Sequence, residues 1–282
     1  MRITCCHDRV PHPTLPVALL TTLCLVHPVF VCALAVEGMW TRFFPAAREI
    51  KRLVQSGAIG KVMSISASLG FKSEPHFNER LFLPELAGGA LFDVGIYPAL
   101  WISMILGPPK TVTAHARMHT SGVDAQTFVT FGYEDGAMAH LECGFLASLP
   151  NDVTIVGETG YIRTSRPCQC PEAYTLVTRQ GDEPDPMLTR ARVETLSTPL
   201  DPPHFGLAPG YNFLGSQGFK FEAAAVQEAI AKGLTEHPEM PLSETLAMAR
   251  VFDDIRAQIG LKYPWDDGAD EAAAPSSKKA RK

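Results

Sequence analysis

The sequence predicts an α+β fold in which helices flank an open, mostly antiparallel sheet. Between residues 63 and 178, short stretches of alternating apolar and polar residues recur, as in half-buried strands. Glu134-Asp135-Gly136 and Glu158-Thr159-Gly160 separate neighbouring stretches and are typical of hairpin turns, and consecutive hairpins make antiparallel neighbours. Segments with helical periodicity lie before, between and after these stretches, which favours an α+β domain.

Length and composition set the limits of this prediction. A chain of 282 residues holds one large or two ordinary domains. With 46% hydrophobic and 20% charged residues, it is too apolar for a disordered protein. The net charge of −5 argues against a nucleic-acid partner, because domains that bind nucleic acids are usually basic.

The first predicted elements are a helix and a strand. Pro45 suits a first helical turn, and residues 46–56 then place Ile50, Leu53 and Val54 on one face, as in an amphipathic helix. Gly57 ends this helix. In residues 63–69, apolar side chains alternate with serines, which predicts a half-buried strand.

A second helix is predicted after the Gly88-Gly89 turn, and it ends before Gly107 and two prolines. Within it, Asp93 and Tyr97 are four residues apart and share one face. Two interpretations follow. Tyr97 is a core aromatic residue and Asp93 a charge at the helix N-terminus, or the pair performs acid–base chemistry on a carbonyl or alcohol.

The rest of the chain supplies further strands and two closing helices. Strands are predicted over residues 111–118, 127–133, 138–146, 153–156, 161–163 and 174–178. Residues 181–210 are rich in Pro, Gly and Asp and are predicted to form a long loop. Helices follow over residues 219–232 and 243–259, with Ser243 as N-cap and Gly260 at the C-terminal end. The uncovered sheet face carries enough apolar residues to predict a partner sheet or a second copy.

Seven cysteines are present, and Cys168-Gln169-Cys170 lacks the spacing of a zinc site. No metal site is predicted. Buried free thiols in a reducing compartment are expected, which indicates a cytoplasmic protein.

The two ends of the chain differ in character from residues 37–265. Residues 1–36 combine a basic start, an apolar run over residues 17–26 and a small-x-small triplet at residues 33–35, as in a secretory signal. His27-Pro28 interrupts the run, so a membrane span is disfavoured. Signal peptide, membrane anchor and non-native leader all stay open. Residues 266–282 are expected to be a disordered tail, and the basic cluster at their end also suits a nuclear signal.

Several motifs, in their order and spacing, resemble the Gfo/Idh/MocA oxidoreductase family. More narrowly, they are similar to its dimeric dihydrodiol dehydrogenase and NADP-dependent D-xylose 1-dehydrogenase branch. The resemblance spans residues 37–265. The motifs are Trp40-Thr41-Arg42-Phe43-Phe44-Pro45, Gly57-Ala58-Ile59-Gly60-Lys61-Val62, Gly88 to Tyr97, Gly122-Val123-Asp124, Pro167-Cys168-Gln169-Cys170-Pro171 and Phe221-Glu222-Ala223.

This resemblance implies an oxidoreductase that moves hydride between a nicotinamide, NADP in this branch, and a sugar or diol. Tyr97 would be the acid/base residue and Asp93 would orient the substrate or tune the pKa of Tyr97. Trp40 and Arg42 would lie near the substrate, and Arg117 is a further candidate; core packing or a surface ion pair are the alternatives for these three. The resemblance also implies a homodimer formed through the open sheet.

The family's NAD(P)-binding Rossmann domain has no counterpart in the sequence. No Gly-x-Gly-x-x-Gly follows a strand, and the family's Glu-Lys-Pro tripeptide is missing. Hydride transfer needs cofactor and substrate held together, so we expect the chain to bind NADP poorly and to turn over slowly or not at all. The choice between NADP and NAD, and between D-xylose and trans-dihydrodiols, stays open.

Two other functions are compatible with the sequence. The chain is a non-catalytic interaction module that dimerises through its open sheet with a full-length paralogue, or it is a secreted or membrane-associated protein directed by residues 1–35. The oxidoreductase is the interpretation that the motifs favour.

Overall fold

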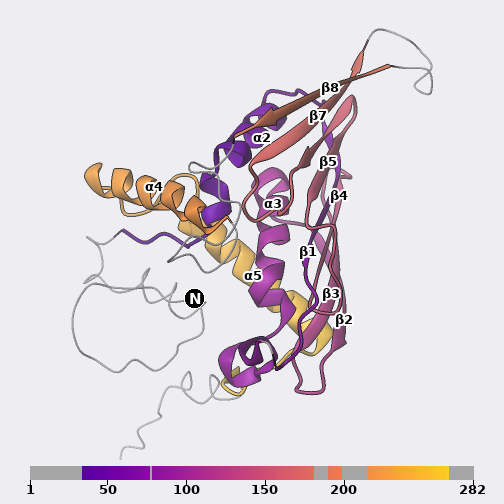
Figure 1. The fold of residues 1–282 in the computed structure, drawn as a ribbon, viewed down its shortest axis with the longest axis vertical. Helices are drawn as coiled ribbons and strands as arrows, with labels where there is room; N and C mark the ends of the chain where they lie inside the picture. The colour runs from indigo at the N-terminus through magenta and orange to yellow at the C-terminus, as the bar shows by residue number, and fades with distance from the viewer. Residues whose placement is uncertain (1–33, 77, 181–189, 199–214, 267–282) are drawn as a thin grey trace, which may run out of the picture.

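The computed structural model describes residues 34–76, 78–180, 190–198 and 215–266. These residues form one eight-stranded sheet with helices on one face (Figure 1). The predicted α+β class with an open, mostly antiparallel sheet is confirmed. The leader up to residue 33, with its four cysteines, and the tail from residue 267 lie outside the described residues.

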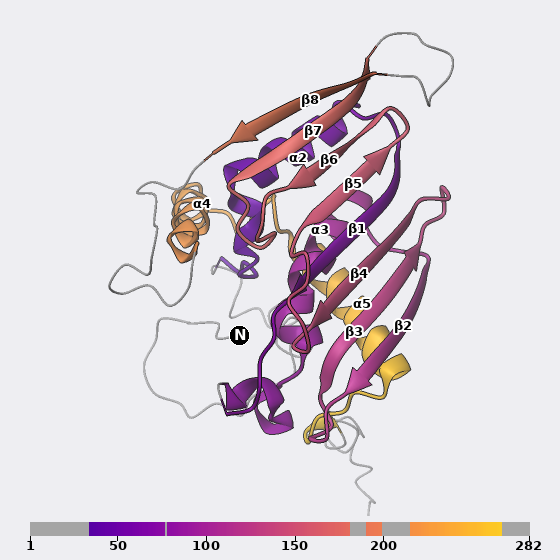
Figure 2. The same ribbon diagram turned by 45° about the vertical axis from the view of Figure 1, so that its right-hand side comes forward.

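The strands form the predicted hairpins, and in addition the first strand, β1, lies between β4 and β5. They are β1 Val62–Gly70, β2 Thr111–Met118, β3 Asp124–Gly132, β4 Met138–Gly144, β5 Val153–Gly157, β6 Gly160–Thr164, β7 Ala173–Gln180 and β8 Arg190–Ser197. Their order across the sheet is β2-β3-β4-β1-β5-β6-β7-β8, which Figure 2 shows from β2 at the lower edge to β8 at the upper edge. The early strand β1 lies in the middle, parallel to β4 and antiparallel to β5. The sheet is therefore mixed, and a meander continues on each side of β1.

Strand β8 corrects the sequence prediction, because Arg190–Ser197 falls within residues 181–210, which were expected to be a loop. It pairs antiparallel with β7 from Ala173↔Ser197 to Gln180↔Arg190. Residues 190–197 contain neither Gly nor Pro and alternate in character, so they can form a ladder although their neighbours in sequence are rich in turn residues.

The predicted helices are present, with changes at their ends. The regular helices are α2 Pro45–Gln55, α3 Ile96–Leu106, α4 Phe219–Ala231 and α5 Leu242–Ile259. Short turns are η2 Trp40–Phe43, η3 Glu79–Phe82, η4 Pro84–Leu86, η6 Ser216–Gly218 and the π-helical η5 Leu91–Gly95, which runs directly into α3. Gly260 ends α5, as predicted, and it adopts the left-handed conformation. Ser243 is not the N-cap, because α5 starts one residue earlier and Pro241 takes that position.

The core lies between the sheet and the helices that cover one of its faces. Ile65, Ile155 and Ile162 face each other across β1, β5 and β6 and are almost completely buried. Helix α3 packs against β1, and α5 packs against β2 and α3 (Figure 1). Pro84–Leu106 is long and apolar enough to cross a membrane, yet more than half of its most apolar window is buried within the fold, as in a core helix. Full burial of each large aliphatic side chain contributes about 1.5–3 kcal/mol.

The described cysteines are free thiols. Cys143, Cys168 and Cys170 are all buried, as predicted for these three. Over the described part of the chain, no three His, Cys, Asp or Glu side chains are placed together to hold a metal ion.

Candidate active site

The Gly88-Gly89 pair allows the backbone of residues 80–81 and the side chain of Asp124 to approach the start of η5. A Cβ on Gly88 would lie 2.8 Å from the carbonyl oxygens of Arg80 and Leu81. Gly89 has a φ of +117°, and a Cβ there would lie 2.3 Å from Oδ1 of Asp124. The Gly89 amide donates to the Leu81 carbonyl at 2.8 Å. Glycine at both positions therefore lets η3 pack directly beside η5.

Asp124, rather than Asp93, binds the first backbone amide of η5. Its Oδ2 accepts hydrogen bonds from the Leu91 amide at 2.8 Å and the Thr127 hydroxyl at 2.7 Å. The side chain is fully buried, and burial raises the pKa of the Asp124 carboxyl, whereas these hydrogen bonds lower it. Since Asp124 satisfies the helix end, Asp93 is available to interact with other groups.

Asp93 and Tyr97 lie together where η5 passes into α3. The Asp93 carboxylate pairs with the guanidinium of Arg80, which the neighbouring turn η3 contributes. Asp93 is about one-fifth exposed, whereas Arg80 is half exposed at the surface. The helical spacing predicted from the sequence thus brings the carboxylate and the phenol to the same cavity.

Trp40 holds the phenol of Tyr97 in place. Its indole Nε1 donates to the Tyr97 hydroxyl oxygen at 3.2 Å, and its ring stacks on Phe219 with centroids 4.2 Å apart. Burial raises the pKa of Tyr97; the Trp40 hydrogen bond opposes this rise, and the nearby Asp93 adds to it. The phenol therefore keeps its proton at neutral pH and is suited to donate it.

A cavity of about 330 Å³ opens beside the phenol. It is lined by Trp40, Leu69, Phe71, Arg80, Asp93, Val94, Tyr97, Asn151 and Gln169. The structure thus brings three of the predicted site residues, Tyr97, Asp93 and Trp40, to one cavity.

Arg42 and Arg117 do not reach this cavity. Arg42 is 2% exposed, donates to the Glu239 carbonyl at 2.7 Å and pairs with the Glu244 carboxylate. Arg117 is exposed on β2 and lies opposite Gln126 in β3, so it projects from the sheet face that the helices leave open.

Sequence reasoning missed three polar residues of the cavity. Arg80 had no signal in a single sequence, because its proximity to Asp93 depends on the glycine contacts. Asn151 lies between β4 and β5, at a φ of +58°, and the sequence likewise held no signal for its role. Gln169 belongs to the Cys168-Gln169-Cys170 motif, which pointed to the family but not to a role for this side chain.

A family model described as the GFO/IDH/MocA C-terminal domain matches residues 47–163. Trans-1,2-dihydrobenzene-1,2-diol dehydrogenase of Bos taurus is 32% identical over 234 residues, which cover 82% of this chain and 63% of that protein. The chain carries a GFO/IDH/MocA C-terminal domain. The Homo sapiens enzyme of the same name is 30% identical over 232 residues, with the same coverage of 82% and 63%. The chain thus spans less than two thirds of the length of these relatives.

Solved structures of the GFO/IDH/MocA type share this fold. Levoglucosan dehydrogenase in complex with NADH and levoglucosan aligns with a TM-score of 0.64 at 20% identity, covering 79% of this chain and 63% of that chain. KijD10, a 3-ketoreductase from Actinomadura kijaniata in complex with NADP and TDP-benzene, aligns with a TM-score of 0.61 at 22% identity, covering 80% and 62%. At this level of identity the match concerns the fold.

In this GFO/IDH/MocA domain, a second carboxylate lies close enough to affect Tyr97. Glu222 lies in the first turn of α4 (Phe219–Ala231), and α4 packs against η2, which carries Trp40. Burial raises the pKa of Glu222 to about 7, and its Oε1 has no hydrogen-bond partner among the described residues. Its charge raises the pKa of Tyr97 further, so Glu222 also helps to keep the phenol protonated.

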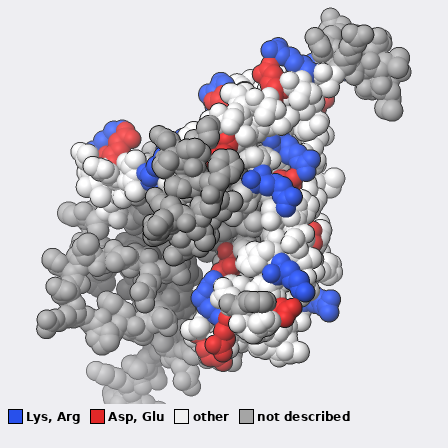
Figure 3. Space-filling model, viewed as in Figure 1, with Lys and Arg blue, Asp and Glu red and all other residues white. Residues whose placement is uncertain are grey.

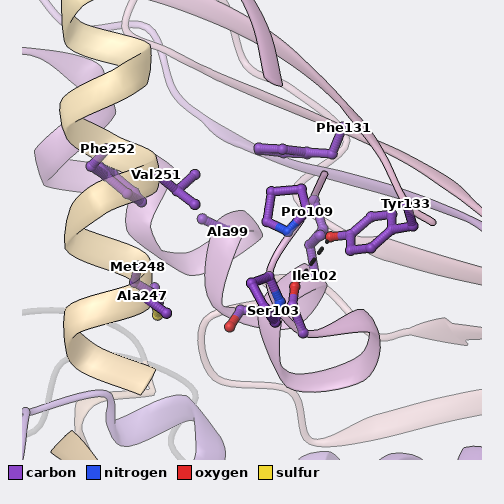
Figure 4. A pocket seen from close by; sticks show the side chains of 12 residues that line it. Ala99, Ile102, Ser103, Pro109, Phe131, Tyr133, Ala247, Met248, Val251 and Phe252 are labelled. Carbon is purple, nitrogen blue, oxygen red and sulfur yellow. Dashed lines mark hydrogen bonds between the residues drawn. The ribbon is translucent and has the colours of Figure 1, made fainter. Parts of the chain in front are cut away.

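A smaller hollow of about 30 Å³ between α3, α5 and the loop after α3 is apolar (Figure 4). Its polar groups are engaged elsewhere: the Tyr133 hydroxyl donates to the Gly107 carbonyl at 3.4 Å and Ser103 donates to Glu244 at 2.8 Å. A volume of this size holds about one or two water molecules and no sugar ring. The larger cavity beside Tyr97 is therefore the candidate active site.

On the molecular face seen in Figure 3, basic and acidic side chains of the described residues lie close to one another rather than in patches of one sign. Such a mixed surface produces little long-range attraction for a polyanion.

Proposed function

We propose that this chain supplies the substrate-binding and proton-transfer groups of an NAD(P)-dependent oxidoreductase that interconverts an alcohol and a carbonyl on a sugar or diol. The observation that carries the proposal is the Tyr97 hydroxyl at the cavity, held by Trp40, with Asp93 one turn before it. The relatives named trans-1,2-dihydrobenzene-1,2-diol dehydrogenase and the neighbours solved with NADH or NADP support it. Two finer proposals, NADP rather than NAD as cofactor and D-xylose as substrate, rest on the family resemblance alone, whereas a trans-dihydrodiol substrate is also supported by the names of the relatives.

Tyr97 moves the proton in this reaction. In the reductive direction it donates its proton to the oxygen of the carbonyl that becomes an alcohol, and in the oxidative direction it accepts the hydroxyl proton. Asp93, paired with Arg80, accepts a hydrogen bond from a neighbouring substrate hydroxyl and so orients the ring. The described residues contain no glycine-rich turn for a cofactor pyrophosphate, so they do not fit a complete nicotinamide site and we derive no step through the cofactor.

The raised pKa of Tyr97 gives this proposal a pH signature. A base is active only when deprotonated, so we expect oxidation to accelerate continuously as the pH rises toward about 10, without a plateau near neutrality. Reduction uses the protonated phenol and should proceed at neutral pH. Initial rates of NADPH oxidation and NADP reduction, followed by absorbance with D-xylose or a trans-dihydrodiol and the corresponding oxidised compounds, measure both directions.

Tyr97→Phe is expected to lower kcat/KM by about 100-fold or more and to abolish this pH dependence. Gln227→Leu, at an exposed position of α4 that does not line the cavity, is the control and should leave the rates unchanged. Equal and measurable rates for wild type and Tyr97→Phe would rule out the acid/base role. The slow turnover expected from the sequence stays a prediction that the same assay tests.

We also propose that the open sheet face binds a second copy of the chain. Val156, Tyr161, Val177 and Val193 are aligned across β5 to β8, and three of them are 37–62% exposed. An aligned apolar row of this kind on a solvent-facing sheet is typical of an interface. The same face favours the second candidate function, an interaction module that pairs with a full-length paralogue.

A cytoplasmic location remains our proposal, supported by the three free thiols.

Tyr161→Lys, which places a charge in the middle of this row, is expected to convert a dimer into a monomer in sedimentation velocity. Gln227→Lys, at an exposed position of α4 on the helix side, is the control. A wild-type chain that sediments as a monomer would rule out the homodimer. Mixing it with a full-length dihydrodiol dehydrogenase then tests the interaction module, which predicts a hetero-complex.

A further inference from the structure

Helix α4 carries a stripe of apolar side chains that reaches the solvent. At helical spacing along one side of the helix, and just beyond its end, lie Phe219, Ala223, Val226, Ile230 and Leu234. Phe219, Ile230 and Leu234 are 42%, 62% and 38% exposed. These five residues, the α4 stripe, form an aligned apolar surface of the kind that is typical of an interaction site.

The described part of the chain leaves this stripe uncovered. Figure 1 shows α4 projecting away from the sheet. Among the described elements it packs mainly against the turns η2 and η6, and its buried residues, Ala225 and Ala229, lie on a different side from the stripe. A further side carries the exposed ion pair of Glu228 and Lys232. The apolar surface is therefore bounded, and a partner of matching width is needed to cover it.

The chain that precedes the described residues enters beside the stripe. The Ala35 amide donates to the Thr235 carbonyl at 3.0 Å, and Ala35 pairs with Glu236 in a parallel bridge. Because parallel segments run in the same direction, the chain before Ala35 comes from the side of Leu234 and the end of α4. Residues 27–33 can span about 23 Å. This exceeds the length of the helical part of the stripe, which is roughly 17 Å.

We propose that the apolar run over residues 17–26 packs on the α4 stripe of the same chain. The run contains no charged residue, glycine or proline. Residues 199–214, which precede α4, are interrupted by prolines and glycines and contain no comparable run. Contact between the run and the stripe removes both apolar surfaces from water. The Phe219 ring stacks on Trp40 with centroids 4.2 Å apart, so the covered surface ends beside the candidate active site.

Cys24 lies within this run and makes the contact measurable by disulfide trapping in the full chain. Ala223→Cys places a thiol on the stripe, and Ala224→Cys places one at the next position, about 100° around the helix. Both positions are exposed, and the described native cysteines are buried. The other cysteines of the leader are replaced by serine in both variants, namely Cys5, Cys6 and Cys32. In a glutathione redox buffer, the disulfide from Cys24 to position 223 should form at least about tenfold faster than the disulfide to position 224.

Non-reducing electrophoresis and peptide mass spectrometry identify the products. Equal rates at the two positions would overturn the inference, because a tethered segment that does not pack on α4 meets both thiols equally often. Disulfides between two molecules at position 223 would show a second copy on the stripe and overturn it as well. Leu20→Asp, which places a charge in the run, should abolish the difference between the two positions, whereas Leu20→Met should keep it. A protein that begins after residue 33 when it is isolated from its native host would also contradict the proposal.

Discussion

Glu244→Ala is expected to lower the free energy of unfolding by about 3–5 kcal/mol, because it leaves a buried guanidinium without its carboxylate. Arg42 is 2% exposed and pairs with Glu244, whose Oε1 also accepts from the Ser103 hydroxyl at 2.8 Å. Without Glu244, the Arg42 guanidinium keeps its hydrogen bond to the Glu239 carbonyl but loses its carboxylate partner. Urea denaturation of the purified chain, followed by far-UV circular dichroism, measures the loss.

An exposed ion pair on the same part of the fold provides the control. Arg48 and Glu239 are 45% and 33% exposed, and Glu239→Ala removes their contact while keeping the backbone carbonyl that Arg42 uses. We expect a loss of at most about 1 kcal/mol for this variant. Similar small losses for Glu239→Ala and Glu244→Ala would show that the buried pair contributes no more than a surface pair.

Glu37 modifies the expected loss. Burial raises the pKa of Glu37, and the charge of Arg42 opposes this rise. When Glu244 is removed, ionised Glu37 can compensate in part for the missing charge on Arg42. The double variant Glu37→Gln with Glu244→Ala should therefore lose more stability than the sum of the two single variants, and a double-mutant cycle measures the excess.

Of the two site residues predicted from the Trp40-Thr41-Arg42 motif, only Trp40 reaches the cavity. The geometry of η2 explains why Arg42 does not. Trp40 and Arg42 are two residues apart on the tight turn η2, so their side chains leave it in different directions. Trp40 reaches Tyr97, whereas Arg42 reaches α5. The sequence shows that both residues belong to one motif, but the direction of each side chain depends on a turn type that periodicity does not predict.

Local sequence patterns predicted most helices and strands correctly. They could not predict which strands pair, because pairing depends on residues far apart in the sequence. The alternation in residues 63–69 correctly indicated a strand, but its place between β4 and β5 depends on contacts with residues 138–157. Strand β8 was missed because the composition around it is that of a loop. The predicted pair Asp93 and Tyr97 lies in one helical segment, whereas Arg80, Asn151 and Gln169 come from separate segments that only the fold brings together.

Gly89→Ala is expected to lower the free energy of unfolding by about 3 kcal/mol or more, through two effects at one atom. A φ of +117° is a conformation that residues with a side chain rarely adopt, which costs about 1–3 kcal/mol. The new Cβ would also lie 2.3 Å from Oδ1 of Asp124. The carboxylate would then have to move away from the Leu91 amide and the Thr127 hydroxyl, each a charge-assisted bond of about 1.5–3 kcal/mol.

Gly122→Ala separates these two effects. Gly122 has a φ of +95°, and a Cβ there would meet nothing within 4 Å, so this variant carries backbone strain without a clash. We expect it to cost about 1 kcal/mol in the same denaturation experiment. Equal losses at Gly89 and Gly122 would mean that the contact with Asp124 does not hold the start of η5. A larger loss at Gly89, together with weaker ligand binding at Asp93, would show that this glycine aligns the helix that carries the carboxylate and the phenol.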